Sequence, residues 1–151
     1  MIAENFAKLV GAWDGTKKLY MRPEDPVFES EIVANIGLEV VKKVLKISYD
    51  WSFKGEKKEG VLLFHVNKEA KTQSVWMDSF HQSSDFMVAN GDLIDGKIST
   101  KANYTQPEYS DWAWRICLGT DDENSFSLTM FNVFPDGNEV LAVDARFKRR
   151  D

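Results

Sequence analysis

Few side chains in this sequence have the chemistry of a metal ligand or a nucleophile. The histidines are His65 and His81, and Cys117 is the single cysteine. The histidines do not have the i, i+4 spacing of a helical metal site, and no cysteine pair or carboxylate cluster accompanies them. We therefore expect no bound metal and no haem, although an inward-facing His65 would be chemically able to hold haem iron. The sequence also lacks a Ser/His/Asp signature, a phosphate-binding loop and a nucleophile elbow.

One carboxylate stands in a setting that suits acid–base chemistry. Asp78 follows Trp76 by two residues, so the two side chains share one face of an extended segment. A carboxyl group beside tryptophan in a dry pocket would have a raised pKa, which is how proteins make a general acid. The chain has 24 acidic residues, and nothing in the sequence selects a second one to work with Asp78.

The elements that must position these residues are mostly strands. From residue 45 to 53 apolar side chains occupy the odd positions and polar ones the even positions, which is typical of a half-buried strand. Short turns, such as Asp95-Gly96, separate one run from the next. We expect a helical turn over residues 3–10, ended by Gly11, and then strands over residues 13–21, 28–36, 41–53, 59–66, 72–80, 85–91, 97–105, 109–118, 125–134 and 139–149.

About ten short strands joined by short turns favour one all-β architecture. A single domain of this kind must hide its sheet edges, and closure removes them completely. We predict a closed antiparallel up-and-down β-barrel over residues 1–151, with a short N-terminal capping helix. A two-sheet sandwich is the alternative, but the spacing has no long crossover of the Greek-key type.

Alternation within the strands indicates which side chains line the barrel. The apolar faces of the predicted strands should turn inward. The expected lumen residues are Tyr49, Trp51, Trp76, Asp78, Phe86, Trp112, Trp114, Met130 and Asn132. This mixture of aromatic and sparse polar groups suits a pocket for a small apolar molecule, with Asp78 as an anchor for a hydroxyl or an amine.

For two groups of charged residues the sequence does not decide whether the side chains point into or out of the barrel. Trp112 lies on the more apolar face of residues 109–118, so Arg115 should point outward, but a slip of one residue would turn Arg115 into the lumen. On the last strand, Asp144 and Arg146 could form an ion pair inside the barrel or lie outside it.

Gly11-Ala12-Trp13 at the head of the first strand resembles the G-x-W signature of the calycin superfamily, which includes lipocalins and fatty-acid-binding proteins. The segments 9–16, 75–79 and 134–139 are similar to an uncharacterised bacterial calycin-like family, domain of unknown function 1579 (DUF1579). The haem barrels called nitrobindins are also similar at the first strand, but Lys17 stands where their next glycine would be.

The resemblance implies roles for several residues. In calycins a basic residue from the last strand covers the tryptophan, which here implies Arg149, or alternatively Arg146, over a buried Trp13. Some similar barrels are decarboxylases or cyclases of aromatic or lipid-like acids, and the corresponding residues here would be Tyr49, Asp78 and Arg115. Ligand binding is therefore the leading hypothesis, and such an enzyme or a packed structural or interaction module are the alternatives.

Composition bounds the partners. The 151 residues carry a formal net charge of −5, and no basic stretch points to nucleic acid. No apolar run reaches the roughly 20 residues that span a bilayer, so we expect no membrane partner. The first residues lack the layout of a secretory signal and one cysteine allows no intrachain disulfide, so we expect a cytoplasmic protein. The oligomeric state is open, a homodimer included.

Overall fold

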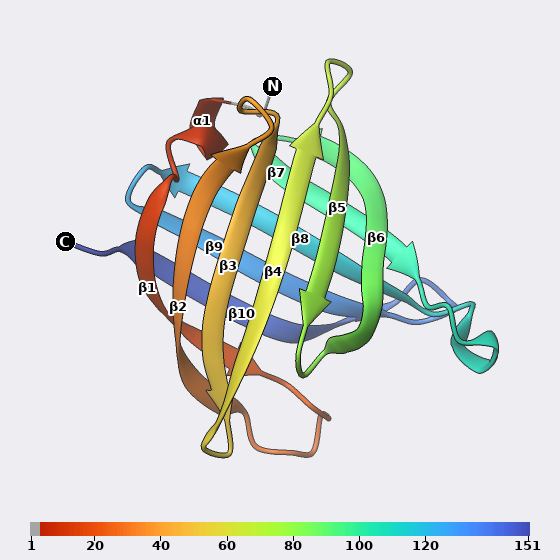
Figure 1. The fold of residues 1–151 in the computed structure, drawn as a ribbon. Helices are drawn as coiled ribbons and strands as arrows, with labels where there is room; N and C mark the ends of the chain where they lie inside the picture. Colours follow the sequence, from red (N-terminus) through yellow and green to blue (C-terminus); the bar gives the residue numbers. More distant parts are fainter. Residues whose placement is uncertain (1–3) are drawn as a thin grey trace.

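The barrel predicted from the sequence is the fold of the protein. A computed structural model describes residues 4–151, in which ten antiparallel strands follow one short helix and close into a barrel (Figure 1). The elements are α1 (Glu4–Ala7), β1 (Gly11–Leu19), β2 (Phe28–Glu39), β3 (Val44–Phe53), β4 (Glu56–Val66), β5 (Lys71–Asp78), β6 (Gln82–Ile94), β7 (Lys97–Asn103), a 3₁₀ turn (Pro107–Tyr109), β8 (Ala113–Asp122), β9 (Ser125–Val133) and β10 (Glu139–Arg149).

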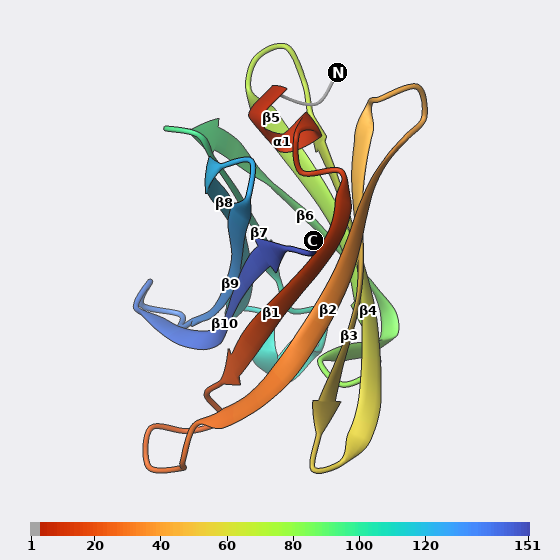
Figure 2. The same cartoon turned by 90° about the vertical axis from the view of Figure 1, so that its left-hand side faces the viewer.

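Each strand pairs with its neighbours in sequence, and β10 returns to pair with β1. The closing ladder runs from Trp13 opposite Arg149 to Leu19 opposite Val143. Seen from the side, β2, β3 and β4 form one wall and β8, β9 and β10 the wall that faces it (Figure 2). No helix within residues 4–151 has the length and apolar character needed to cross a membrane.

Helix α1 closes one end of the barrel. Phe6 and Leu9 are fully buried there beside Trp13, whose indole nitrogen donates a hydrogen bond of 2.8 Å to the Leu9 carbonyl. Residue 3, where the expected helical turn began, lies outside the described residues. The helical turn and the first strand are therefore joined by one buried indole. We call the opposite end, which no α-helix of residues 4–151 covers, the open end.

Arg149 covers Trp13 from the last strand. Its guanidinium carbon lies 4.5 Å from the centroid of the Trp13 ring, a cation–π distance. The same guanidinium donates hydrogen bonds to the carbonyls of Lys8, at 2.6 Å, and Val10, at 2.9 Å. Gly11 has φ +140°, and a Cβ there would lie 2.7 Å from Arg149 Nη1, so both the backbone angle and the guanidinium require glycine.

Two strands were predicted to begin too early, for reasons of local backbone conformation. The third strand begins at Val44 and not at residue 41, because Val40, Val41 and Lys42 all have positive φ and form a turn. Val41 is 90% exposed there. The eighth strand begins at Ala113 and not at residue 109, because Pro107 starts a 3₁₀ turn.

The wall of the barrel is open on one side, between β6 and β7. Strand β6 pairs with β5 along most of its length but with β7 only through Asn90–Ile94. Where β6 and β7 pair, their backbones lie close together, since a Cβ on Gly91 would lie 1.7 Å from the Ser99 carbonyl oxygen. Beyond it, the first half of β6 has no strand partner on that side, which leaves a lateral opening near the open end of the barrel.

We predict that Trp13→Ala lowers the free energy of unfolding by about 3–5 kcal/mol, because the change removes a fully buried indole and leaves a cavity. Urea titration followed by circular dichroism measures this loss. Trp112→Ala is the control: this half-buried ring packs on Phe134 at the opposite end, and its loss should be less than half as large. Equal losses would contradict the role of Trp13 as the anchor of the closed end.

Candidate functional site

A buried carboxylate lies at the centre of the open half of the barrel. Asp78, at the end of β5, is 1% exposed. Its Oδ2 accepts hydrogen bonds from the Tyr49 hydroxyl at 2.6 Å and from Trp51 Nε1 at 3.2 Å. Its Oδ1 accepts two more from the backbone N–H groups of Phe80 and His81, at 2.7 and 2.9 Å. The four donors satisfy both oxygens, which is the condition for burying such a group.

Local backbone features bring these donors together. A bulge between Trp76 and Asp78 ends the regular pairing of β5 with β6, and the turn that follows wraps around the carboxylate. On the neighbouring strands Gly60 lies beneath the ring of Tyr49, and a Cβ there would stand 2.2 Å from the ring. Gly60 therefore lets the phenol lie flat across β4 and reach Asp78.

A lysine projects into the same space from β1. Inward positions alternate along this strand, so Lys17 shares the face of Trp13 and Leu19 and is 3% exposed. Its Nζ lies 2.9 Å from His81 Nε2 and 3.0 Å from the centroid of the Trp51 ring. The lysine, the histidine and the indole thus form one contact group above Asp78, and we call Lys17, Tyr49, Trp51, Asp78 and His81 the polar cluster.

Burial governs the charges of the basic members. Removal from water lowers the pKa of Lys17 to about 7, and the negative charge of Asp78 offsets only part of this effect. Burial, and then the positive charge of Lys17, lowers the pKa of His81 to about 3, against the opposing pull of Asp78. At neutral pH His81 is therefore neutral, and Lys17 exchanges between amine and ammonium.

The pKa of Asp78 is shifted in the direction opposite to the one expected from the sequence. Burial acts to raise the pKa of Asp78, but the hydrogen bonds from Tyr49 and from the backbone of His81 and Phe80 outweigh it, so the pKa lies below its ordinary value. The expectation of a raised pKa was wrong because it did not include these donors. Burial, and then the charge of Asp78, raises the pKa of Tyr49 well above 10.

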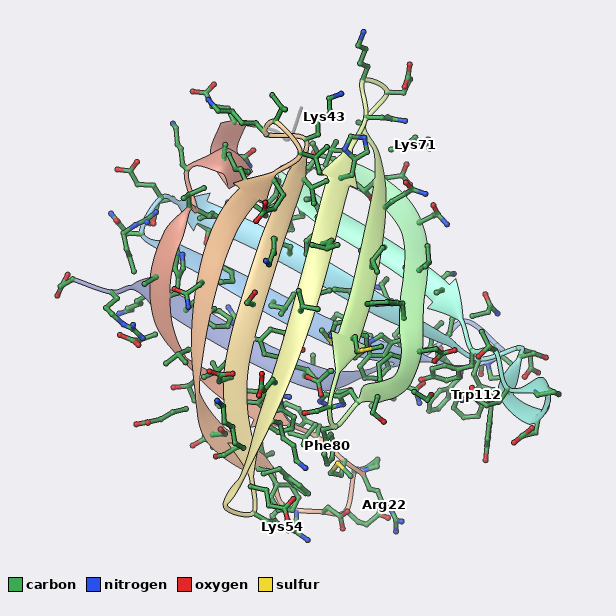
Figure 3. The ribbon with its side chains drawn as sticks, in the orientation of Figure 1. Arg22, Lys43, Lys54, Lys71, Phe80 and Trp112 are labelled. Carbon is green, nitrogen blue, oxygen red and sulfur yellow. The ribbon has the colours of Figure 1, made fainter. Side chains whose placement is uncertain are left out.

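Aromatic rings enclose the polar cluster. The His81 ring stacks on Trp51 with 5.5 Å between centroids, and Trp76 and Trp114 stack almost in parallel at 5.8 Å. Trp76 donates its N–H to the Tyr49 hydroxyl at 3.0 Å. The N–H of Trp114 is buried and has no acceptor among residues 4–151. At the end of the barrel opposite α1, where Figure 3 shows Phe80 and Lys54, the Phe80 ring packs edge-on against Phe53 with 4.8 Å between centroids.

A side pocket of about 480 Å³ occupies the opening between β6 and β7. His81 lies in its wall, and Tyr104 donates a hydrogen bond of 2.7 Å to Asn132 Oδ1 within it. Burial raises the pKa of Tyr104, so its hydroxyl stays neutral. The remaining wall comes from β6, from the end of β7 and from the segment that joins β7 to β8: Gln82, Asp85, Phe86, Met87, Val88, Ala102, Asn103, Thr105, Gln106, Tyr109 and Trp112.

The expected lumen residues fall into three groups. Tyr49, Trp51, Trp76 and Asp78 are in mutual contact, with the Trp114 ring against Trp76. Met130 is buried in the core. Trp112 and Asn132 line the side pocket at the rim, where Trp112 extends away from the barrel axis (Figure 3).

The expectation for Phe86 was wrong. Its side chain is 58% exposed and points outward, while Met87 and Ala89 point into the barrel. Met87 lies opposite the inward-facing Trp76 of β5, so alternation along β6 turns the adjacent Phe86 outward. Phe86 nevertheless borders the side pocket from its outer edge.

Residues whose facing was open lie outside the lumen. Arg115 pairs with Glu139 and lies over the Phe131 ring, so it does not approach Tyr49 and Asp78. Arg146 and Asp144 are paired at 2.8 Å, with the arginine largely exposed. His65 Nδ1 lies 2.8 Å from the Lys43 carbonyl at the surface. The trio of Tyr49, Asp78 and Arg115 that the calycin enzymes suggested is therefore not assembled.

Comparison with known proteins agrees with this architecture. The family described as protein of unknown function (DUF1579) matches residues 3–149. The chain belongs to the DUF1579 family. No curated protein matches this DUF1579 chain.

Two solved structures illustrate the shared fold. Rv2717c from M. tuberculosis has 13% identity and a TM-score of 0.65, with both chains covered completely. The S-type phycobiliprotein lyase CPES from Guillardia theta has 14% identity and a TM-score of 0.66, over 97% of this chain and 90% of that one. At these identities the likeness concerns the fold alone.

Sequence reasoning missed Lys17, His81 and Tyr104 as members of the site. For Lys17 a signal was present: residues 13, 15, 17 and 19 share one strand face, and Trp13 and Leu19 mark that face as the buried one. For His81 and Tyr104 no comparable signal exists, because both lie where regular strands end.

We predict that the free energy of unfolding rises by about 2 kcal/mol between pH 7 and pH 9 because of Lys17. In this range the unfolded chain keeps the lysine proton, whereas folded Lys17, with its pKa lowered to about 7, releases it. The unfolded state therefore binds more protons, and stability increases with pH. Denaturant titration at several pH values measures the slope, which Lys17→Met should abolish.

The control for this slope is Lys18→Met, which changes the adjacent exposed lysine. It should retain the pH dependence of the unchanged protein. Parallel curves for the unchanged protein and Lys17→Met would show that Lys17 keeps its proton in the folded state.

Proposed function

We propose that this protein binds one small, uncharged and largely aromatic or apolar molecule in the side pocket between β6 and β7. The observation that carries the proposal is the pocket itself, about 480 Å³ in volume and reaching His81 at the polar cluster. Ligand pockets in proteins typically measure about 300–1,000 Å³.

The chemistry of the wall selects the ligand class. Phe86, Tyr109 and Trp112 offer aromatic surface, and Met87 offers an adaptable apolar one. The Tyr104 hydroxyl and the Asn132 amide are neutral polar groups of the wall. The carboxylate of the wall, Asp85, is exposed and already accepts hydrogen bonds from Gln82 and Ser84. An anionic ligand would lose its hydration here without gaining an ion partner, because the wall that residues 4–151 form contains no lysine or arginine. A ring with one hydroxyl or carbonyl group would meet both the aromatic and the neutral polar surface.

The side pocket replaces the centre of the lumen as the proposed binding place. Lys17 and His81 fill the space between Trp51 and Trp76, and both oxygens of Asp78 already accept hydrogen bonds. We therefore propose the amide of Asn132, and not Asp78, as the polar anchor. The likeness to a phycobiliprotein lyase supports the proposal that a barrel of this fold acts on or binds a small molecule. The single cysteine fits our proposal of a cytoplasmic protein.

We predict that the neutral fluorophore N-phenyl-1-naphthylamine binds with a micromolar Kd and gains fluorescence on transfer into the apolar pocket. Ala102→Phe, which places a ring in the pocket wall, should weaken binding at least tenfold. The matched control is Lys101→Phe, which adds the same ring at the exposed adjacent position of β7 and should leave the Kd unchanged.

Two results would overturn the proposal. One is the absence of binding at micromolar concentrations, which would favour a packed structural or interaction module. The other is equal binding by the unchanged protein and Ala102→Phe, which would place the fluorophore elsewhere. Fluorescence titration with circular dichroism of each variant separates these results from a failure to fold.

A further inference from the structure

We propose that Lys17 is a reactive amine which forms a reversible imine with small aldehydes that enter between β1, β2 and β3. This site is distinct from the side pocket and goes beyond the proposed binding function. The proposal rests on how the Lys17 nitrogen is held, on what surrounds it and on a small cavity that reaches this side chain.

The nitrogen of Lys17 is held from two sides and has no third hydrogen-bond partner. His81 Nε2 lies 2.9 Å away and, in the neutral tautomer that carries its proton on Nδ1, accepts one N–H of Lys17. The Trp51 ring, 3.0 Å from Nζ, receives the nitrogen at its face. Among residues 4–151 no other side chain or carbonyl is within hydrogen-bond distance of Nζ. An amine held in this way keeps one free direction, which its lone pair can occupy.

The surrounding charges favour the neutral amine. From β5, Asp78 is the nearest carboxylate, but no described carboxylate lies within 4.0 Å of Nζ, and the hydrogen bonds from Tyr49 and Trp51 spread its charge. Glu29 of β2 and Lys54 after β3 lie at the mouth of the cavity, and Glu29 pairs with Lys18. The pKa of Lys17, lowered to about 7 chiefly by burial, follows from this setting and gives an amine where surface lysines are ammonium.

A cavity of about 40 Å³ reaches Lys17 from outside the barrel, between β1, β2 and β3. Trp51, Phe28 and Phe53 form its apolar walls, and Glu29, Ser30 and Lys54 its outer edge. The cavity is about one-twelfth the volume of the side pocket and far smaller than an aromatic ligand needs. The class of reactant is therefore a short-chain aldehyde.

The step is balanced without an oxidant or a reductant. The Lys17 nitrogen forms a bond to the carbonyl carbon as the carbonyl π bond breaks, and one nitrogen-bound proton passes to the oxygen. The resulting hydroxyl leaves with the second proton as water while the nitrogen–carbon double bond forms. Water reverses the reaction. The dry aromatic walls of Trp51, Phe28 and Phe53 favour the imine by limiting the water available for hydrolysis.

The test uses propanal as the probe and sodium cyanoborohydride to trap the imine as a stable propylamine at pH 7. Peptide mapping by mass spectrometry then compares Lys17 with Lys18, the adjacent exposed lysine of β1. We expect Lys17 to be labelled at least tenfold faster than Lys18 in spite of its burial. The labelling rate of Lys17 should level off above pH 8, whereas that of Lys18 should keep rising towards pH 10.

Variants make the result decisive. Lys17→Arg keeps the positive charge but cannot form an imine, so the fast-labelled fraction should disappear while intact-protein labelling of the surface lysines stays unchanged. Labelling of Lys17 that is equal to or slower than that of Lys18 at pH 7, in protein with native circular dichroism, would overturn the proposal. Because Ala102→Phe does not touch this cavity, it should leave propanal labelling unchanged, so failure of fluorophore binding and failure of imine formation remain distinct outcomes.

Discussion

The buried charge of Asp78 is the constraint on which the open half of the barrel depends. A carboxylate removed from water costs several kcal/mol unless hydrogen bonds replace its hydration. Here the replacements come from two different parts of the chain: Tyr49 and Trp51 on β3, and the backbone of the turn after β5. Satisfying one side chain therefore fixes the position of that turn against β3. Because His81 belongs to the turn, the same requirement places the imidazole that meets Lys17.

The two ends of the barrel solve different physical problems. At the closed end, Trp13 is covered by an arginine whose donors meet the free carbonyls of the helical turn, and every partner there is a backbone oxygen or an aromatic face. Such contacts lock the first and last strands together and leave no group free to react. At the open end the buried groups are titratable side chains that meet one another. The fold thus separates the part that closes the chain from the part that can carry chemistry.

The sequence predicted the barrel well because a closed sheet repeats one simple rule. The alternation at Leu45, Ile47, Tyr49 and Trp51 marked the inward face of β3, and all four are buried. The rule failed where the backbone departs from it. The 3₁₀ turn at Pro107 moved Trp112 to the rim. Phe86 faces outward for another reason: β6 pairs with β5 in the register that places Met87 opposite the inward-facing Trp76.

The site was harder to predict than the fold because its polar members contradict the same rule. A lysine within a strand is normally an outward residue, so Lys17 was not considered for the lumen although its neighbours Trp13 and Leu19 marked that face as buried. The pKa of Asp78 was misjudged for a related reason: the apolar neighbour Trp76 was visible in the sequence, whereas the backbone donors of Phe80 and His81 arise only when the turn has folded. Sequence patterns report which side chains avoid water, but not which donors converge on a buried charge.

Burying the polar cluster also costs free energy of folding, and this cost bears on the reason for its presence. A methionine at position 17 would fill a similar volume without losing the hydration of an ammonium group, and buried ion pairs seldom stabilise a protein more than well-packed apolar residues do. The lowered pKa of Lys17 expresses this cost directly, because the folded protein must give up a proton that the unfolded chain would keep. Packing alone therefore gives no reason for a lysine inside this barrel. Strongly shifted pKa values beside a cavity are characteristic of sites that bind or react, and Lys17 and His81 each combine such a shift with a place in a cavity wall.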